Sequence, residues 1–290
     1  MILNRTLTTG AALAALTLAA CGAPPAPVPD PPRSPARPAV ASPGPSGTPS
    51  AVASVSDARG RRFTVQPDGA DTLVRAFARG ATAPAAQRRL TGRWTLPRVV
   101  PGGPLDGLTP DGRHLALEST PAAGQSRLAL VRTTLDAAPT VVTLPGEHTF
   151  DAWSPDGGLL YTIEHRPPAG SSHYQVRVYD VRAGALRDQP VADKATLDEE
   201  MDGRPTSRAA TPDGGTVATL YLPAPGGGHR HGPFVHLLDT RNAIALCVDM
   251  PAEVSTGWSL RYAAGRVHLL DRSGTVNRLL DPASGELTRP

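Results

Sequence analysis

The chain has 290 residues with a formal net charge of +3, and 40% of them are hydrophobic although only 4% are aromatic. Without the segment 1–20, the chain would keep 28 basic and 26 acidic side chains. So small an excess predicts no basic surface for nucleic acid. Two cysteines in the whole chain exclude a disulfide framework.

The start of the chain has the pattern of a bacterial signal peptide. Arg5 lies in a polar start, and residues 10–20 form an apolar run of mostly small side chains that ends at Cys21. The run is shorter than the ~20 apolar residues of a transmembrane helix, and small residues precede the cysteine as they do at a processing site. We therefore expect residues 1–20 to be a signal peptide.

The residues Leu18-Ala19-Ala20-Cys21 resemble the lipobox of bacterial lipoproteins. The resemblance implies cleavage before Cys21 and acylation of its thiol and of the new amino terminus, with fatty acids such as palmitate. Two or three acyl chains make a durable membrane anchor, whereas one does not. We expect a protein anchored to the cell membrane and facing outside the cytoplasm, in the periplasm or the extracellular space. The alternative is an ordinary secretory signal with a chance cysteine.

A proline-rich segment follows. Residues 22–50 contain eleven prolines and few charges or large apolar side chains, so they cannot bury enough surface to offset the entropy lost on ordering. Proline-rich linkers are extended, at ~3.1 Å per residue. We expect residues 21–57 to be a disordered tether that starts with the lipidated Cys21, and residues 58–290 to be the folded domain. A role as ligand for a proline-binding module is the alternative, but no repeated docking motif supports it.

A tight turn recurs along the predicted domain, with its aspartate at positions 68, 111, 156 and 213. Proline presets φ, aspartate bonds nearby backbone, and glycine accepts a positive φ. The first two intervals match the periods of ~40–50 residues that indicate propeller blades or another repeat array, and the third is longer. The turns are Pro67-Asp68-Gly69, Pro110-Asp111-Gly112, Pro155-Asp156-Gly157 and Pro212-Asp213-Gly214. We expect structural roles for their Asp and Gly residues.

The segments after these turns predict β-strands. Residues 113–117, 159–163 and 216–222 are rich in aliphatic and β-branched side chains and are bounded by glycine and proline. A second landmark is an apolar strand that ends in aspartate, at Asp180 and at Asp239. Each follows the turn aspartate of its own unit at nearly the same interval along the chain. Two landmarks in similar phase predict a repeating unit of several strands.

The Ser/Thr-Pro-Asp-Gly turns at 109–112, 154–157 and 211–214 resemble those of bacterial TolB-like and WD40-like β-propellers. The resemblance covers most of residues 58–290 and implies four-stranded antiparallel blades around a central channel. At ~45 residues per blade the domain has room for about five. Unlike in true WD40 repeats, no Gly-His pair opens the units and no Trp-Asp pair ends them. The last unit is short, and residues 63–65 are a candidate strand to complete it from the other terminus.

Little in the sequence predicts helix, apart from a helical turn in a solvated insertion at residues 193–202. His229, His231 and His236 are weak candidates for metal ligands. Imidazoles at i and i+2 lie on one face of an extended strand, and zinc binds such groups. The alternative is an exposed flexible loop after three glycines, so no metal or cofactor is predicted.

Cys247 lies in an apolar run and is expected to pack as a small hydrophobic residue. No nucleophile elbow, and hence no catalytic residue, is predicted. Two function classes remain. The first is a lipid-anchored propeller that acts as a non-catalytic binding or scaffold module for a protein, peptide or cell-wall ligand, and we favour it. The alternative is a propeller enzyme of the lactonase or glycosidase type, with several charged side chains converging at the channel mouth.

Overall fold

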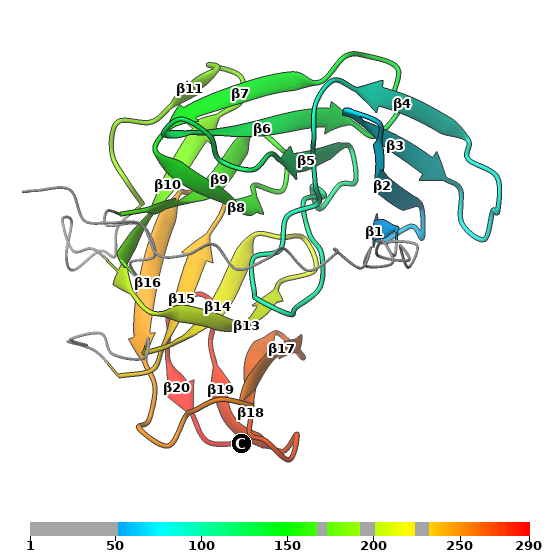
Figure 1. Ribbon diagram of the computed structural model, residues 1–290. Helices are drawn as coiled ribbons and strands as arrows, with labels where there is room; N and C mark the ends of the chain where they lie inside the picture. Colours follow the sequence, from blue (N-terminus) through cyan, green and yellow to red (C-terminus); the bar gives the residue numbers. More distant parts are fainter. Residues whose placement is uncertain (1–51, 167–172, 192–200, 224–231) are drawn as a thin grey trace, which may run out of the picture. The chain divides into compact units, whose positions relative to one another are not determined.

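The computed structural model describes residues 52–166, 173–191, 201–223 and 232–290 (Figure 1). The chain divides into two units, Met1–Pro49 and Ser50–Pro290, and every described residue belongs to the second. Across the described ranges the secondary structure is all β, with no helix, and so no helix that could span a membrane. The strands form five antiparallel sheets, which we name A to E in chain order.

The sheets follow one another along the sequence without mixing their strands. Sheet A consists of β1 (Ala53–Ser56), β2 (Arg62–Asp68), β3 (Asp71–Phe77) and β4 (Ala86–Leu90). Sheet B consists of β5 (His114–Glu118), β6 (Gln125–Arg132) and β7 (Thr140–Pro145). Sheet C consists of β8 (Glu147–Trp153), β9 (Leu159–His165), β10 (His173–Asp180) and β11 (Ala185–Leu186), with β12 (Met201–Asp202) paired to β10. Apart from β12, each strand pairs with its neighbour in sequence, so each sheet is a meander.

The last two sheets have the same four-stranded order. Sheet D consists of β13 (Arg204–Ala210), β14 (Thr216–Leu222), β15 (Phe234–Asp239) and β16 (Ile244–Asp249). Sheet E consists of β17 (Ser259–Ala263), β18 (Arg266–Leu270), β19 (Val276–Leu280) and β20 (Leu287–Thr288). In sheet B the segment before β5 takes the place of a first strand, because Leu108 bridges Leu115 and Thr95 bridges Glu118.

Four hydrophobic clusters lie between successive sheets. The cluster between sheets A and B includes Phe63 and Trp94, and the one between B and C includes Phe150 and Trp153. The cluster between C and D includes Tyr161 and Tyr221, and the one between D and E includes Leu220 and Trp258. Small meanders that bury their faces against the next sheet in chain order have the construction of propeller blades. A single meander cannot bury both faces alone, so neighbouring sheets stabilise one another.

Strand β14 shows how the sequence produces this packing. Its side chains alternate between two cores, as the period of two along a strand requires. Val217 and Tyr221 join the cluster against sheet C, whereas Ala218, Leu220 and Leu222 join the cluster against sheet E. A strand buried on both faces therefore needs a continuous apolar run rather than an alternating pattern.

The two terminal sheets are not joined by such a cluster among the described residues, so the succession of sheets is not closed into a ring there. The expectation that residues 63–65 complete the last unit is wrong. Phe63–Val65 lie inside β2, between β1 and β3. Sheet E has four strands from its own part of the chain.

The folded unit starts before residue 58, which the composition suggested as its first residue. β1 begins at Ala53, and Ala53 and Val55 pack against the cluster between sheets A and B. The small residues of Ala-Ser-Val-Ser hide this alternation in the sequence. In the expected helical insertion, Met201–Asp202 form β12 instead, and residues 192–200 lie outside the described ranges.

Candidate functional site

The three Ser/Thr-Pro-Asp-Gly turns have the same hydrogen bonds. Each joins the first strand of its sheet, or in sheet B the segment that takes its place, to the next strand. In sheet D, Thr211 Oγ1 donates to Asp213 Oδ1 (2.7 Å) and accepts from the Thr216 amide, while Asp213 Oδ1 accepts from the Gly215 amide. Thr109 and Ser154 make the corresponding bonds in sheets B and C. Gly112, Gly157 and Gly214 all have φ near +70°.

These bonds favour the charged form of the carboxylates of Asp156 and Asp213. The Ser154 hydroxyl and the Gly158 amide lower the pKa of Asp156. The Thr211 hydroxyl, the Gly215 amide and the Arg241 guanidinium lower the pKa of Asp213 to about 2. The turns are therefore rigid elements that fix the end of each inner strand.

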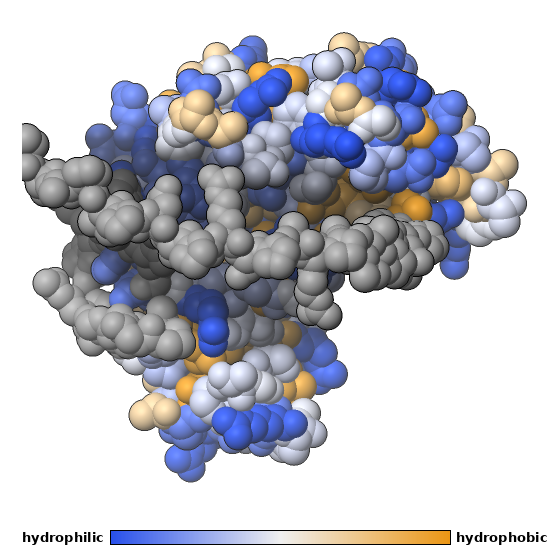
Figure 2. Space-filling model, viewed as in Figure 1, coloured by the Kyte–Doolittle hydropathy of each residue, from blue (hydrophilic) through white to orange (hydrophobic). Residues whose placement is uncertain are grey.

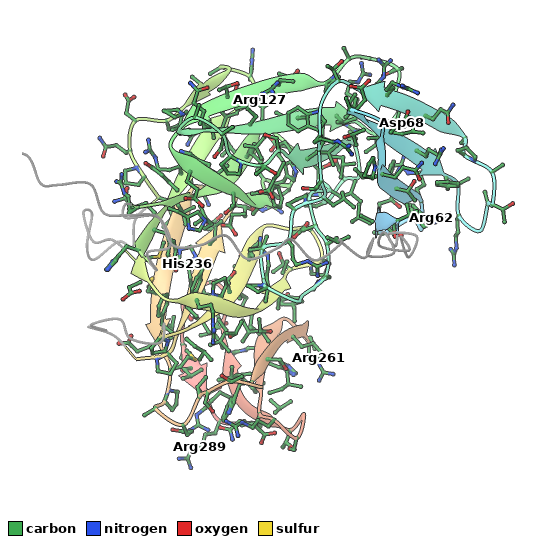
Figure 3. All side chains as sticks on the ribbon, in the orientation of Figure 1. Arg62, Asp68, Arg127, His236, Arg261 and Arg289 are labelled. Atoms are coloured by element: carbon green, nitrogen blue, oxygen red, sulfur yellow. The ribbon has the colours of Figure 1, made fainter. Side chains whose placement is uncertain are left out.

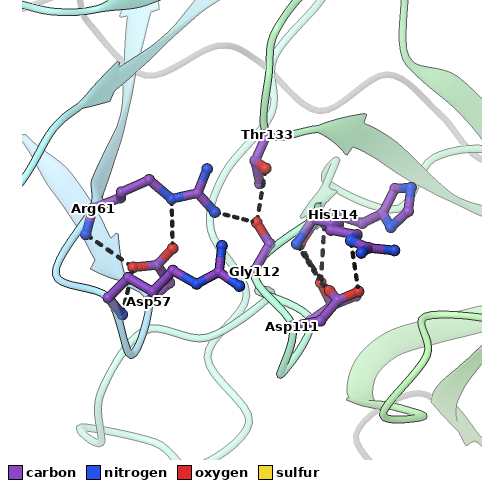
Figure 4. Close-up of polar contacts among 9 residues, drawn as sticks. Asp57, Arg61, Asp111, Gly112, His114 and Thr133 are labelled. Atoms are coloured by element: carbon purple, nitrogen blue, oxygen red, sulfur yellow. Dashed lines mark hydrogen bonds and ion pairs between the residues drawn. The ribbon is translucent and has the colours of Figure 1, made fainter.

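Neighbouring turns contact one another, as Figure 4 shows for sheets A and B. The carbonyl of Gly112 accepts hydrogen bonds from Arg61 Nη2 (2.8 Å) and Thr133 Oγ1 (2.7 Å). Gly214 of sheet D lies so close to Pro110 of sheet B that a Cβ there would overlap its ring. The turns of sheets A, B and D thus lie on the same end of the molecule.

Sheet A uses a different turn from the one its sequence suggested. Pro67-Asp68-Gly69 forms the β2–β3 hairpin, where Asp68 is paired with Asp71 and Gly69 has φ of +64°. The turn equivalent to the other three joins β1 to β2 and is closed by Asp57. Its Oδ1 accepts from the amides of Arg59 and Arg61, and its Oδ2 pairs with Arg61 Nε at 2.7 Å. Without proline directly before Asp57 or Ser/Thr two positions before it, this turn has no motif to mark it.

A cavity of about 200 Å³ opens where the inner edges of sheets B, C and D meet these turns. It is lined by Asp106, Leu108, Pro110, Phe150, Ala152, Trp153, Arg208, Ala210, Thr211, Pro212, Gly214 and Val217. Most of these side chains are apolar. Trp153 Nε1 donates to the carbonyl of Gly107 (2.8 Å), which ties the segment before β5 to sheet C.

Arg208, which lines the cavity, belongs to a buried ion pair. Arg208 on β13 donates from Nη1 to Asp151 Oδ1 and from Nη2 to the Asp151 carbonyl on β8, both at 2.6 Å. The side chains are 14% and 4% exposed. Burial opposes the charge of Arg208, but Asp151 and Asp106 outweigh it and raise its pKa. The guanidinium thus links sheet D to sheet C.

Asp106 is the second carboxylate near Arg208. It is half-buried, and its Oδ1 accepts from the Gly107 amide (2.7 Å). Among the described residues it makes no ion pair within 4 Å. With Asp151, which pairs with Arg208 but does not line the cavity, the two carboxylates and the guanidinium have a summed formal charge of −1.

Sequence reasoning missed these three residues, yet their positions carry a signal. Asp106, Asp151 and Arg208 each stand five positions before a turn aspartate, at Asp111, Asp156 and Asp213. They therefore occupy the same position of the repeat, on the inner strands. A search for charged residues at a fixed offset from the turns would have brought them together.

The candidate metal ligands are not assembled in the described part of the chain. His229 and His231 lie outside it. His236 is on β15, 2% exposed, with its ring edge-on to Tyr221 at 6.5 Å between centroids. No group of three or more His, Cys, Asp or Glu residues suited to a metal occurs within the described ranges.

Cys247 lies on β16, directly opposite His236 in the ladder. It is half-buried, and its Sγ is 4.0 Å from Met201 Sδ at the edge of the cluster between sheets C and D. Trp94, Trp153 and Trp258 are all buried in clusters between sheets, as packing aromatics are.

A buried polar cluster lies at the opposite end of sheet C. His148 is 4% exposed, with Nδ1 3.1 Å from Thr162 Oγ1 and Nε2 3.0 Å from the Pro145 carbonyl. Burial lowers its pKa. Glu164 binds Arg177 at 2.7 Å and Arg166 at 3.2 Å. With both ring nitrogens and the carboxylate engaged, this cluster stabilises the sheet rather than presenting a reactive group.

Comparison with known proteins bears on the fold. No family model and no curated protein sequence matches the chain. Among solved structures it is similar to a putative TolB from Agrobacterium tumefaciens, at 13% identity and a TM-score of 0.45 over 82% of this chain and 79% of that one. It is also similar to TolB from Acinetobacter baumannii (13%, 0.41, 79% and 53%) and to the WD40 domain of Toxoplasma gondii coronin (12%, 0.45, 82% and 58%).

The chain thus spans about half the length of the last two structures. At such low identities and TM-scores, the similarities assign neither a family nor an activity to it.

Proposed function

We propose that the protein is a lipid-anchored cell-envelope module that binds a protein or peptide partner at the cavity between the inner strands, without catalysing a reaction. The observation that carries the proposal is the cavity itself. Most of its lining residues are apolar, and its two charged lining residues, Asp106 and Arg208, come from equivalent positions of sheets B and D. A concave site with a few polar groups can serve binding or catalysis. Only two charged residues line this one, whereas the enzyme alternative calls for several, so we favour binding.

The size and charge of the cavity indicate what it accepts. Pockets for small-molecule ligands typically have volumes of ~300–1,000 Å³, and this one has about 200 Å³. That space suits one anchoring side chain of a partner. Because Asp151 is neutralised by Arg208 while Asp106 is not, a lysine or arginine side chain fits the residual charge. Its aliphatic stem would lie against Trp153 and Pro212.

The anchor depends on Cys21. Growth with labelled palmitate should label the mature protein, and Cys21→Ser should abolish both the label and the attachment to membranes. A Ser variant that keeps its label would reject the lipidation site. This experiment tests the localisation separately from the binding site.

The binding site is tested by photocrosslinking in living cells. A photoreactive phenylalanine in place of Pro212, which is exposed at the cavity rim, should give a discrete protein adduct. The same group in place of the exposed Ala283 on sheet E is the control and should give none. Asp106→Asn should reduce the adduct at position 212. Equal adducts at both positions, or no effect of Asp106→Asn, would contradict the proposed site.

A further inference from the structure

The charges of the folded unit are distributed unevenly, although their sum is close to zero. Residues 52–95, which form sheet A and its loops, contain eight arginines and three aspartates, a net charge of +5. Residues 96–290 contain 18 basic and 22 acidic residues, a net charge of −4. A small net excess of basic residues thus coexists with a local concentration of arginines in sheet A.

Arg59, Arg61, Arg62 and Arg79 gather at one end of this sheet, and Arg75 lies opposite Thr64, two positions before the end of β3. We call these five residues the arginine cluster. Arg59 and Arg61 lie in or next to the β1–β2 turn, and Arg62 at the start of β2 pairs with Phe77 at the end of β3. The loop after β3 returns to the same place, because the Arg79 side chain lies 3.1 Å from where a Cβ of Gly60 would be.

Little of this charge is neutralised locally. Arg61 is paired with Asp57 at 2.7 Å. The Arg62 guanidinium lies over the Phe77 ring, 4.1 Å from its centroid, a contact that supplies no opposite formal charge. Arg59 and Arg79 are exposed. The cluster with Asp57 has a net charge of +4.

The other end of sheet A differs. There Asp68 forms an ion pair with Arg89 at 2.6 Å, and the Asp71 carboxylate accepts from the Gly92 amide. Figure 3 labels Arg62 and Asp68 at the two ends of β2. Figure 2 shows many hydrophilic residues over the part of the molecule that sheet A forms. The sheet is thus polarised along its strands, with its basic end formed by the arginine cluster.

The position of sheet A in the chain suggests the partner. The tether between Cys21 and β1 joins the folded unit at this sheet, so the arginine cluster belongs to the sheet nearest to the proposed anchor in sequence. Guanidinium groups bind phosphate oxygens in pairs of hydrogen bonds. Each basic residue near an anionic bilayer adds attraction that decays within a Debye length, and a basic patch reinforces an acyl anchor.

We propose that the arginine cluster of sheet A docks on the anionic phospholipid headgroups of the membrane that holds the anchor. The inference rests on the proposed lipid anchoring and deepens it. Docking orients the folded unit, with sheet A against the bilayer, and leaves the cavity between sheets B, C and D to the partner.

The test uses the acylated mature chain in vesicles. Ala78→Cys introduces the labelling site next to Arg79, and Cys247→Ser removes the second thiol that a dye could label. Energy transfer from a dye on the introduced thiol to a headgroup-labelled lipid is measured on phosphatidylcholine vesicles with and without phosphatidylglycerol (about 30 mol%). We expect transfer about twofold higher with phosphatidylglycerol, falling to the neutral-vesicle value at about 0.5 M salt.

Matched variants separate the arginine cluster from net charge. Arg59→Glu with Arg79→Glu should abolish the gain, whereas Arg182→Glu with Arg261→Glu, which changes two exposed arginines elsewhere, should keep it. Equal transfer on both vesicle types, or equal loss in both double variants, would overturn the proposal.

Flotation with neutral vesicles reports on the anchor alone. If the chain does not float with neutral vesicles, the lipidation proposal fails. Flotation with phosphatidylglycerol vesicles then tests by itself whether the arginine cluster binds anionic lipid. In that case the loss of flotation in the Arg59→Glu, Arg79→Glu variant should be on the order of a hundredfold in partitioning.

Discussion

A hydroxyl and a carboxylate two positions apart close each of the three inner turns, with glycine at positive φ between them and the next strand. The chemistry of these residues made Asp111, Asp156 and Asp213 recognisable in the sequence. Asp57 closes the equivalent turn of sheet A but was missed, since Ser56 instead of proline stands directly before it and Val55 instead of Ser or Thr stands two positions before it. Hydrogen bonding by a lone aspartate leaves no spacing pattern to find.

Gly214→Ala should destabilise the fold more than the same change at Gly69. Both glycines have φ between +64° and +70°, so alanine strains the backbone at each, at a cost of about 1–3 kcal/mol. Only at Gly214, of these two, would the new Cβ overlap Pro110 of another sheet, since Gly69 has nothing within 4 Å. Denaturant unfolding of both variants measures the difference. Equal midpoints would show that the turns of sheets B and D do not touch in solution.

Glu118 should make stability depend on pH. Burial raises the pKa of its carboxyl above the usual 4.5, although the Phe150 amide donates to it. The folded state therefore favours the protonated form. The free-energy cost of burying the charged carboxylate destabilises the folded state above the raised pKa. This cost disappears as the pH falls below the usual pKa.

Glu118→Gln should thus increase the free energy of unfolding at pH 7, with the gain vanishing below about pH 4. Thermal or urea unfolding across this range measures it. Glu147→Gln, an exposed change on β8, serves as the control and should show no such gain at pH 7. A Glu118→Gln gain that is constant with pH would show that the carboxyl is not penalised by burial.

At the scale of elements, the strands after each turn were predictable because their aliphatic runs are bounded by glycine and proline. β1 was not, since its serines and alanine match the composition of the tether. The prediction that Phe63–Val65 pair with the last unit was also wrong, because strand propensity does not reveal with which strands a strand pairs.

The turn of the β17–β18 hairpin has a strained backbone that one substitution should relieve. Ala263 pairs with Arg266, and the two turn residues Ala264 and Gly265 have φ of +49° and +77°. Such two-residue turns favour Asn-Gly. Ala264→Asn should stabilise sheet E by about 0.5–1 kcal/mol, read as a higher denaturant midpoint. A lower midpoint would contradict this turn geometry.

The Arg208–Asp151 pair joins β13 to β8 and is expected to be strongly coupled. Arg208→Met leaves the Asp151 carboxylate, 4% exposed, without its cation, and should cost about 3–5 kcal/mol. Adding Asp151→Asn should recover part of that loss, because the buried charge is then removed as well. A double-mutant cycle measures the coupling. Additive effects would mean that the two side chains do not interact.

At the scale of the whole molecule, the repeat phase in the sequence indicated the succession of antiparallel sheets. The repeat phase did not indicate whether sheets A and E pack against each other, because an apolar run shows that a strand is buried but not what buries it. The outer faces of sheets A and E are polar, which explains why no hydrophobic cluster joins these two sheets in the described part of the chain. Arg75 and Gln87 on sheet A, and Arg261 and His268 on sheet E, lie opposite each other within their own sheets, away from the hydrophobic clusters.

The cavity likewise required the fold, since Asp106, Asp151 and Arg208 lie in three separate repeats and meet only when sheets B, C and D pack together. Their common offset from the turns was present in the sequence. It had no meaning before the inner strands were placed.

The most direct test of the binding site is a nuclear magnetic resonance titration that follows the Trp153 indole N–H, which bonds to Gly107 at the cavity wall. The ligands are capped single amino acids, with arginine and lysine compared against glutamate. The account predicts that the cationic ligands shift this resonance saturably, that glutamate does not, and that Asp106→Asn weakens the cationic response. Equal shifts with glutamate, or a response unchanged by Asp106→Asn, would contradict it.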